Sequence, residues 1–248
     1  MSIAELLEEH KQVFENADRI VVFTGAGISA ESGVPTFRSP DGIWAKFKPE
    51  ELANINAFMA NPDRVWEWYE HRREVVEHAE PNPGHWAIVD LENIFDRVDV
   101  ITQNVDGLHA RAGSKRIYEL HGSLHAHRCL NCSQPYTLSV KESGVPHCPS
   151  CGGLIRPGVV WFGEDLPFDV WQQAEEATRS CDVFISVGTS TVVYPAAQLP
   201  FLALSLDKHV VEVNTEATEL TRHADISFRG PAGEVLPQLV EALRKVRA

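Results

Sequence analysis

Side chains able to do chemistry are concentrated in residues 102–109, which read TQNVDGLH and follow an apolar run typical of a buried strand. Polar residues such as Gln103, Asn104 and Asp106 commonly cap loops, but at a strand end they can also orient a ligand amide, a water molecule or a ribose hydroxyl. His121 follows a second short strand pattern and precedes Gly122. A neutral imidazole, with a pKa of about 6.5, can take a proton from a hydroxyl group near pH 7.

An upstream segment indicates what this polar stretch faces. Residues 19–30 read RIVVFTGAGISA, an apolar strand that breaks into a glycine turn and then a helix. Gly25, Gly27 and Ala30 match the GxGxxG/A turn, in which small residues let backbone N–H groups approach a pyrophosphate. Dehydrogenases carry an acidic residue about twenty residues later, at the end of a second strand. Here residues 31–40 read as a loop, so no strand is present to carry that residue. We therefore expect chemistry on the dinucleotide itself rather than hydride transfer.

Four of the five cysteines form two CxxC pairs separated by fifteen residues, Cys129, Cys132, Cys148 and Cys151. This spacing is typical of a tetrahedral zinc site built from two knuckles. Two disulfides or a redox CxxC are the alternatives, and the lack of a secretory signal and the pairing of the motifs argue against them. Nearby histidines could substitute as ligands, namely His125, His127 and His147. Four thiolates leave no open position, so the zinc is expected to be structural, and Cys181 is expected to be a buried apolar residue.

Length and charge restrict the function classes. A chain of 248 residues can bury a full α/β core, and a net charge of −13 argues against a nucleic-acid partner. Residues 1–9 lack the basic segment and apolar run of a signal peptide. No apolar run approaches the ~18–20 residues of a membrane-spanning helix. We expect a cytoplasmic monomer with neither a membrane nor a nucleic-acid partner.

Apolar strand patterns alternate with helical ones, which predicts an α/β fold with a doubly wound, parallel, Rossmann-like sheet. The predicted strands are 20–23, 98–101, 117–120, 183–187 and 210–213, and helices are predicted over 3–17, 169–180 and 194–206. Polar or small residues follow several of these strands. Because parallel strands end at one edge of a sheet, we expect these residues to meet in one crevice.

Two stretches interrupt the alternation and predict a smaller inserted domain. Residues 41–80 are helical and aromatic-rich, and residues 124–157 contain the cysteines. We assign 1–40, 81–123 and 158–248 to the nucleotide-binding domain, and the two interruptions to a helical and zinc-binding small domain.

In combination, these motifs resemble those of the sirtuins. The segment from Gly25 to Arg38 matches the pattern GAGxSxxSGxPxFR, residues 102–109 match TQNxDxLH, and His121 stands in an HG dipeptide. The resemblance implies that His121 is the general base, that Asn104 and Asp106 act beside it, and that Phe37 shields the site. It places the NAD site at Gly25, Ala26, Gly27, Ile28, Ser29, Ala30, Glu31, Thr36, Phe37, Arg38, Trp44, Gln103, Asn104, Val105, Asp106, Gly188, Thr189, Ser190, Asn214, Thr215, Glu216 and Ala232.

The substrate side carries a second resemblance, to the class that includes human sirtuin 5. Tyr69 and Arg72 match a Tyr-x-x-Arg pair that binds the carboxylate of succinyl-, malonyl- or glutaryl-lysine, and Ala53 matches a small residue that widens the acyl pocket. Without the resemblance, Arg72 would be read as a solvated helix residue. The implied substrate-binding residues are completed by Val160, Trp161, Phe162 and Gly163, which resemble a segment that pairs with an extended peptide.

The resemblance implies an NAD-dependent protein-lysine deacylase that acts on acylated proteins or peptides. Its products would be nicotinamide, free lysine and 2′-O-acyl-ADP-ribose, with NAD as co-substrate and one structural zinc. Two alternatives stay open at this point. A mono-ADP-ribosyltransferase would use the same site with another acceptor, and a non-enzymatic NAD sensor would bind NAD without releasing nicotinamide.

Overall fold

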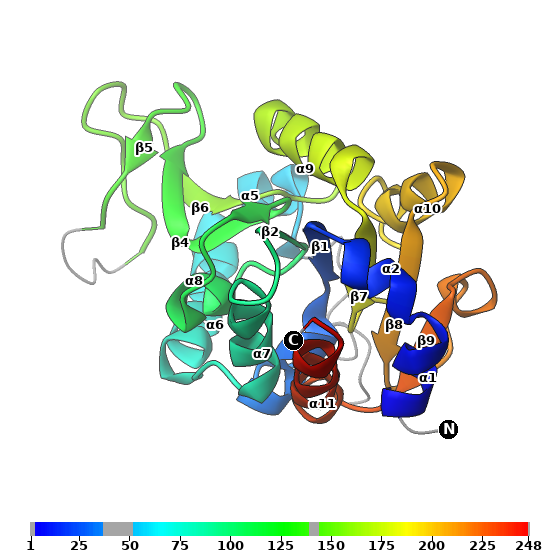
Figure 1. Ribbon diagram of the computed structural model, residues 1–248. Helices are drawn as coiled ribbons and strands as arrows, with labels where there is room; N and C mark the ends of the chain where they lie inside the picture. Colours follow the sequence, from blue (N-terminus) through cyan, green and yellow to red (C-terminus); the bar gives the residue numbers. More distant parts are fainter. Residues whose placement is uncertain (1–2, 37–51, 139–143, 248) are drawn as a thin grey trace.

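The computed structural model describes residues 3–36, 52–138 and 144–247, so the predicted site residues Phe37, Arg38 and Trp44 lie outside the described part. A six-stranded sheet runs through the middle of the chain, in the order β3-β2-β1-β7-β8-β9, and every neighbouring pair is parallel (Figure 1). Its strands are β1 (Arg19–Thr24), β2 (Arg97–Thr102), β3 (Ile117–Glu119), β7 (Val183–Val187), β8 (His209–Asn214) and β9 (Ile226–Arg229).

The strand order fixes where a ligand can bind. The chain starts in the centre at β1, moves outward to β3, and returns to the other side of β1 at β7. The connections that leave β1 and β7 therefore diverge to opposite faces of the sheet. In parallel sheets this switch point opens a crevice beyond the carboxyl ends of the strands. The predicted Rossmann-like arrangement is confirmed.

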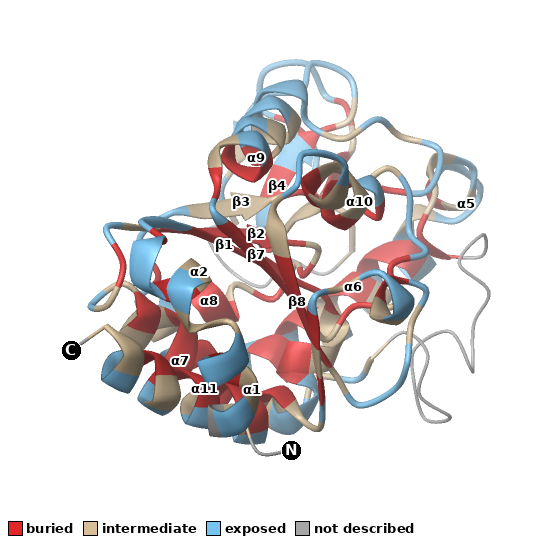
Figure 2. Ribbon diagram, turned by 45° about the vertical axis from the view of Figure 1, so that its right-hand side comes forward, coloured by how far each residue is buried: buried red, intermediate tan, exposed pale blue. Residues whose placement is uncertain are grey.

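Helices cover both faces of the sheet, which explains why the strands are nearly all apolar. On one face, Val22, Val100 and Val211 pack against helices from both ends and from the first half of the chain. These helices are α1 (Ile3–Glu9), α2 (Lys11–Asn16), α7 (Pro83–Leu91) and α11 (Ala232–Val246). On the other face, Val21 and Val210 pack against α9 (Phe168–Ser180) and α10 (Gln198–Ser205). Figure 2 shows the buried strands between these two layers.

A smaller antiparallel sheet, ordered β5-β4-β6, stands beside the main one. It contains β4 (Gly122–Cys129), β5 (Pro135–Tyr136) and β6 (Ile155–Val159), with α5 (Ile55–Ala60) and α6 (Pro62–His78) packed nearby. A separate core joins these parts, because Phe58, Tyr69, Leu124 and Trp161 are buried together. Gly122 at the start of β4 pairs with Val159 at the end of β6. Both residues lie close to the predicted domain boundaries, which stay a prediction.

Several local expectations need correction. The helix expected after the glycine turn is the 3₁₀ helix η1 (Ala26–Ser32), the predicted 3–17 helix is divided between α1 and α2, and α10 starts later than residue 194. Strand β9 was not predicted. The remaining elements are α8 (Leu108–Ala112) and η2 (Leu220–Arg222). Among the described helices, none combines the length and apolar character needed to cross a membrane.

Candidate active site

A cavity of about 1220 Å³ lies at the switch point, beyond the carboxyl ends of the strands. It runs from the strand-end loops of the main sheet to the buried core of the small domain. Most of the predicted site residues that the structure describes line it. These are Gly25, Ala26, Gly27, Ala30, Thr36, Ala53, Tyr69, Arg72, Gln103, Asn104, Val105, His121, Val160, Trp161, Phe162, Gly163, Gly188, Thr189, Ser190, Asn214, Thr215, Glu216 and Ala232.

The glycines at this edge allow two loops to touch. A Cβ atom on Gly27 would lie 2.7 Å from the Cα of Gly188, and one on Gly25 would lie 2.7 Å from the Cβ of Thr189. The N–H of Gly27 donates to the carbonyl of Gly188 at 2.8 Å. This N–H is therefore already paired within the protein, and Gly27 serves the close packing of the loops after β1 and β7.

Asn104 and Asp106 are connected through Ser29. The Asn104 amide donates to the Gly25 carbonyl and to the Ser29 hydroxyl, both at 3.1 Å, and the Ser29 hydroxyl donates to Asp106 at 2.8 Å. Burial raises the pKa of Asp106, while the N–H of Leu108 and the Ser29 hydroxyl oppose that shift. Asn104 lines the cavity, whereas Asp106 stands behind it.

Four predicted NAD-site residues do not line the cavity, namely Ile28, Ser29, Glu31 and Asp106. Ile28 and Ser29 are buried on η1. The carboxylate of Glu31 accepts from the N–H of Gly233 at 2.7 Å, which ties η1 to the start of α11. These side chains fix the position of the loop rather than face the cavity.

His121 is held in one tautomer. Its Nδ1 lies 2.9 Å from the carbonyl oxygen of Gln103. A carbonyl can only accept, so Nδ1 carries the hydrogen and Nε2 of the neutral ring retains a free lone pair. Burial lowers the pKa of His121, and the hydrogen bond to Gln103 opposes this shift. The neutral, proton-accepting form is thus favoured at pH 7.

The far end of the cavity is built around Tyr69, which is 1% exposed. The indole N–H of Trp161 donates to the Tyr69 hydroxyl at 2.9 Å. Half-buried Arg72 places its guanidinium carbon 4.8 Å from the centre of the Trp68 ring. Burial lowers the pKa of Arg72, and Tyr69 and Asp106 oppose that shift. A positive group and a phenol thus meet beside the small residue Ala53 on the cavity wall.

An ion pair between buried Arg156 and half-buried Glu164 fixes the segment after β6. Arg156 pairs with Glu164, donates to the Val159 carbonyl at 2.8 Å, and stacks 3.5 Å from the centre of the Trp161 ring. The N–H groups of Val160 and Phe162 donate to the carbonyls of His121 and Ala53, respectively. A bound peptide strand would therefore pair with other backbone groups of this segment.

The four paired cysteines converge as predicted. Their Sγ atoms lie within 4.8 Å of one another, with 3.4 Å between Cys129 and Cys151 and 3.8 Å between Cys132 and Cys148. A tetrahedral zinc site with zinc–sulfur distances of about 2.3 Å spaces its sulfurs about 3.8 Å apart. The residues present therefore fit a structural zinc ion. The fifth cysteine, Cys181, is buried in the core as expected.

A chain of buried polar groups continues behind Asn104. The Thr102 hydroxyl accepts from the Asn104 N–H and from the Thr24 hydroxyl, and Thr24 in turn contacts His109 Nε2 at 2.9 Å. The His109 and His85 rings are 5.0 Å apart and fully enclosed. Burial lowers the pKa of His85 to about 4 and that of His109 to about 3. Both rings are therefore neutral at pH 7.

The sequence prediction missed part of the cavity wall. The missed residues are Val159, Glu164, Leu166, Val192, Val193, Tyr194, Pro195, Val213, Ala217, Thr218, Glu219, Arg222 and Gly230. Many of them flank a predicted site residue, so extending each strand-end motif in both directions would have found them. Tyr194 and Pro195 instead fell within the helix predicted over 194–206.

Known proteins similar in sequence to this chain belong to one family. A model of the Sir2 family matches residues 25–195. The chain is 51% identical over 246 residues to NAD-dependent protein deacylase 2 of Pyrobaculum aerophilum, covering 99% of this chain and 96% of the relative. It is 52% identical over 229 residues to the NAD-dependent protein deacylase of Aquifex aeolicus, covering 91% and 95%.

Solved structures agree with the sequence matches. The fold resembles that of a Sir2 homolog in complex with NAD, with a TM-score of 0.91 at 46% identity, covering 97% of this chain and 95% of that one. It also resembles Sir2 in a complex with a p53 peptide and NAD⁺, with a TM-score of 0.83 at 33% identity, covering 95% and 97%.

Proposed function

The chain belongs to the Sir2 family and is an NAD-dependent protein deacylase, and on this premise we propose that it prefers lysine acyl groups that end in a carboxylate. The observation that carries this proposal is the pairing of Arg72 with Tyr69 on the cavity wall beside Ala53. A guanidinium can hold a carboxylate through two parallel hydrogen bonds, and it does so most strongly where water is largely excluded. Succinyl- and malonyl-lysine carry such a carboxylate, whereas acetyl-lysine does not.

The NAD substrate would lie along the strand-end edge. Asn214, Thr215 and Glu216 would face its adenosine part, and the loops at Gly25–Ala30 and Gly188–Ser190 its phosphates and ribose. Support comes from the position of all these segments at the switch point, where parallel sheets bind dinucleotides. In the reaction, NAD would supply the ribose carbon that bonds the acyl oxygen and the ribose hydroxyl that finally carries the acyl group.

His121 would take the proton from a ribose hydroxyl. Its hydrogen-bearing Nδ1 faces Gln103, which leaves Nε2 as the proton acceptor. Such a general base typically contributes ~10²–10⁴-fold to the rate. Asn104 is fixed by Gly25 and Ser29 and would orient a group of the substrates at the reacting carbon. Asp106 does not line the cavity and would hold Ser29 and Arg72 in place.

Nicotinamide would leave as the acyl carbonyl oxygen bonds the ribose carbon C1′, and the deprotonated ribose hydroxyl would then attack the acyl carbon. Water would finally release the lysine amine and leave the acyl group on the ribose, so the proposed products are nicotinamide, free lysine and 2′-O-acyl-ADP-ribose. Protein or peptide substrates would reach the acyl pocket along the segment from Val160 to Gly163, where exposed Phe162 lies beside the buried Trp161.

Mass spectrometry tests the proposal directly. Acetyl-, succinyl- and malonyl-lysine versions of one peptide are incubated with the protein, with and without NAD. We expect NAD-dependent release of all three acyl groups, faster for the succinyl and malonyl peptides, with one acyl-ADP-ribose formed per lysine freed. A faster reaction with the acetyl peptide would reject the acidic-acyl preference, and ADP-ribosylated protein in place of free lysine would reject the proposed products.

A further inference from the structure

A buried carboxylate stands in the middle of β8. Glu212 is 1% exposed and lies level with Ser186 of β7 and Ser227 of β9 in the strand register. Residues on either side of Glu212 are buried valines. A carboxylate in such a place is costly unless all of its lone pairs accept hydrogen bonds.

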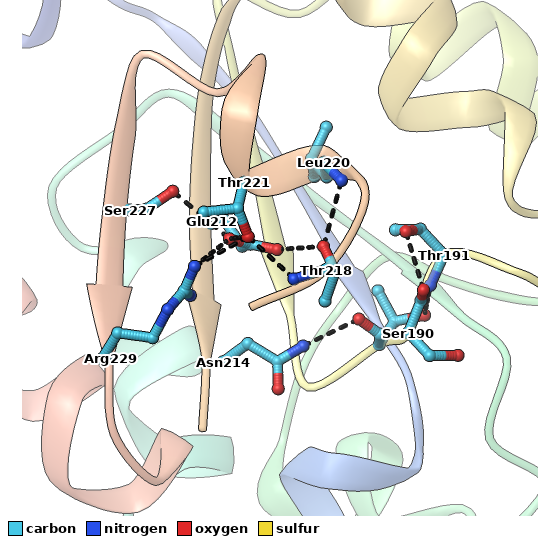
Figure 3. Close-up of polar contacts among 10 residues, drawn as sticks. Ser190, Thr191, Glu212, Asn214, Thr218, Leu220, Thr221, Ser227 and Arg229 are labelled. Carbon is cyan, nitrogen blue, oxygen red and sulfur yellow. Dashed lines mark hydrogen bonds and ion pairs between the residues drawn. The ribbon is translucent and has the colours of Figure 1, made fainter. Parts of the chain in front are cut away.

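Donors from β9 and from the segment after β8 surround Glu212 (Figure 3). It accepts from the hydroxyls of Thr218 and Thr221, the latter at 2.7 Å, and from Ser227 at 3.2 Å. The guanidinium of Arg229 donates to the same carboxylate at 3.0 Å. Because every partner donates, only an acceptor with several lone pairs satisfies them all.

These contacts close the loop between β8 and η2. Thr221 also accepts from the N–H of Thr218 at 2.8 Å and from Arg229 at 2.7 Å. Thr218 accepts from the N–H of Leu220 at 3.1 Å. The conformation of the loop backbone therefore depends on the carboxylate of Glu212, which holds Thr218 and Thr221.

The same loop forms one end of the cavity. Residues 215–219 all line it, as do Asn214 before them and Arg222 after them, whereas Glu212 itself does not reach it. Asn214 joins this loop to the loop after β7 by donating to the Thr189 carbonyl at 2.8 Å. A substitution at Glu212 would therefore change the conformation of the loop at this end of the cavity without removing any of the side chains that line it.

We propose that Glu212 is a positioning residue for the adenosine end of NAD: it holds the 215–222 loop in the conformation that binds the nucleotide. This inference rests on the proposed orientation of NAD, with Asn214 and Glu216 on the adenosine side. The hydrogen-bond partners of Glu212 are Thr218, Thr221, Ser227 and Arg229, whereas His121 bonds Gln103 and Tyr69 bonds Trp161. Loss of the Glu212 contacts should weaken NAD binding and leave the chemical step intact.

Glu212→Gln is the informative variant, because it keeps the size of the side chain and replaces one acceptor oxygen with an NH₂ group that faces donors. Asp99→Asn is the matched control. Asp99 is also a buried strand carboxylate paired with an arginine, Arg97, and it does not line the cavity. Steady-state kinetics would give kcat, the KM for NAD and the KM for an acyl-lysine peptide, and calorimetry would give the Kd for ADP-ribose.

For Glu212→Gln we expect the KM for NAD and the Kd for ADP-ribose to rise about tenfold, as lost buried hydrogen bonds imply. The kcat and the inhibition by free nicotinamide should stay within about twofold of wild type, because in the proposed orientation neither depends on the adenosine end of the site. Asp99→Asn should leave both NAD constants unchanged. An unchanged KM for NAD in Glu212→Gln, or an equal rise in both variants, would overturn the inference.

Glu216→Ala separates this inference from the orientation on which it rests. If that variant binds ADP-ribose as wild type does, the adenosine end lies elsewhere and the proposed orientation fails. If Glu216→Ala weakens binding and Glu212→Gln does not, the orientation stands and the positioning role of Glu212 is wrong.

Discussion

The Nδ1 atom of His121 lies 2.9 Å from the carbonyl oxygen of Gln103, which fixes the ring tautomer from the protein backbone. The same residue, Gln103, donates its side-chain amide to the Thr189 hydroxyl at 2.8 Å. One residue thus joins His121, the proposed general base, to the loop after β7. His121 and the loops proposed to bind NAD are therefore positioned together.

His121→Ala should abolish deacylation while NAD binding persists. The imidazole is the proton acceptor in the proposed reaction, so its removal should lower kcat by ~10²–10⁴-fold. Gel filtration and calorimetric titration with NAD would check that the fold and the binding site remain. Turnover within a few-fold of wild type would show that another group takes the proton.

Removing zinc should unfold the small domain rather than only slow the reaction. Structural zinc sites contribute on the order of 10–16 kcal/mol of apparent binding energy in small peptides. We expect one zinc per chain by elemental analysis, and Cys148→Ser should lower metal content, solubility and activity together. Cys181→Ser, a buried cysteine outside the cluster, is the control for metal content. Freshly purified protein with no zinc would contradict the assignment.

Two enclosed histidines predict a loss of stability in acid. His85 and His109 have folded-state pKa values of about 4 and about 3, below the ordinary value. In an unfolded chain they take up protons from about pH 6.5 downward. Between these limits the unfolded state binds more protons, so the free energy of unfolding falls as pH decreases, by up to ~1.4 kcal/mol per pH unit for each ring.

Urea unfolding at several pH values between 7.5 and 4.5 measures this slope. His109→Gln should flatten it, because a neutral side chain cannot be protonated. The exposed His78 provides the control, and His78→Gln should keep the wild-type slope. Equal slopes for His109→Gln and wild type would show that the buried ring does not govern the acid transition.

The central sheet was predictable because its strands are short apolar runs with small or polar residues after them, and β7 occupies the predicted residues 183–187. Strand β9 was missed because Ser227 and Arg229 interrupt its apolar pattern, and both point toward Glu212. Glu212 itself looks like an ordinary charged strand residue. Its role depends on three hydroxyls and a guanidinium that come together only in the fold.

Local motifs do not show which residues face the cavity. Ser29 and Asp106 belong to the expected NAD motifs, yet both are buried: the Ser29 hydroxyl accepts from Asn104 and donates to Asp106. Tyr194, which has no motif of its own, is 63% exposed at the cavity rim. The residue types indicated which chemistry to expect. Whether a given residue lines the cavity or lies behind its wall depends on how the loops pack.

The ratio of desuccinylation to deacetylation in Arg72→Met tests the proposed acyl preference most directly. Methionine keeps much of the side-chain length but cannot bind a carboxylate. We predict a strong rise in KM and a fall in kcat/KM for succinyl-lysine, while acetyl-lysine turnover changes little or improves. Arg73→Met, at the neighbouring helix position, should keep the wild-type ratio. A general catalytic defect would lower both substrates together, and an unaltered ratio in Arg72→Met would contradict the acidic-acyl preference and leave an ordinary deacetylase.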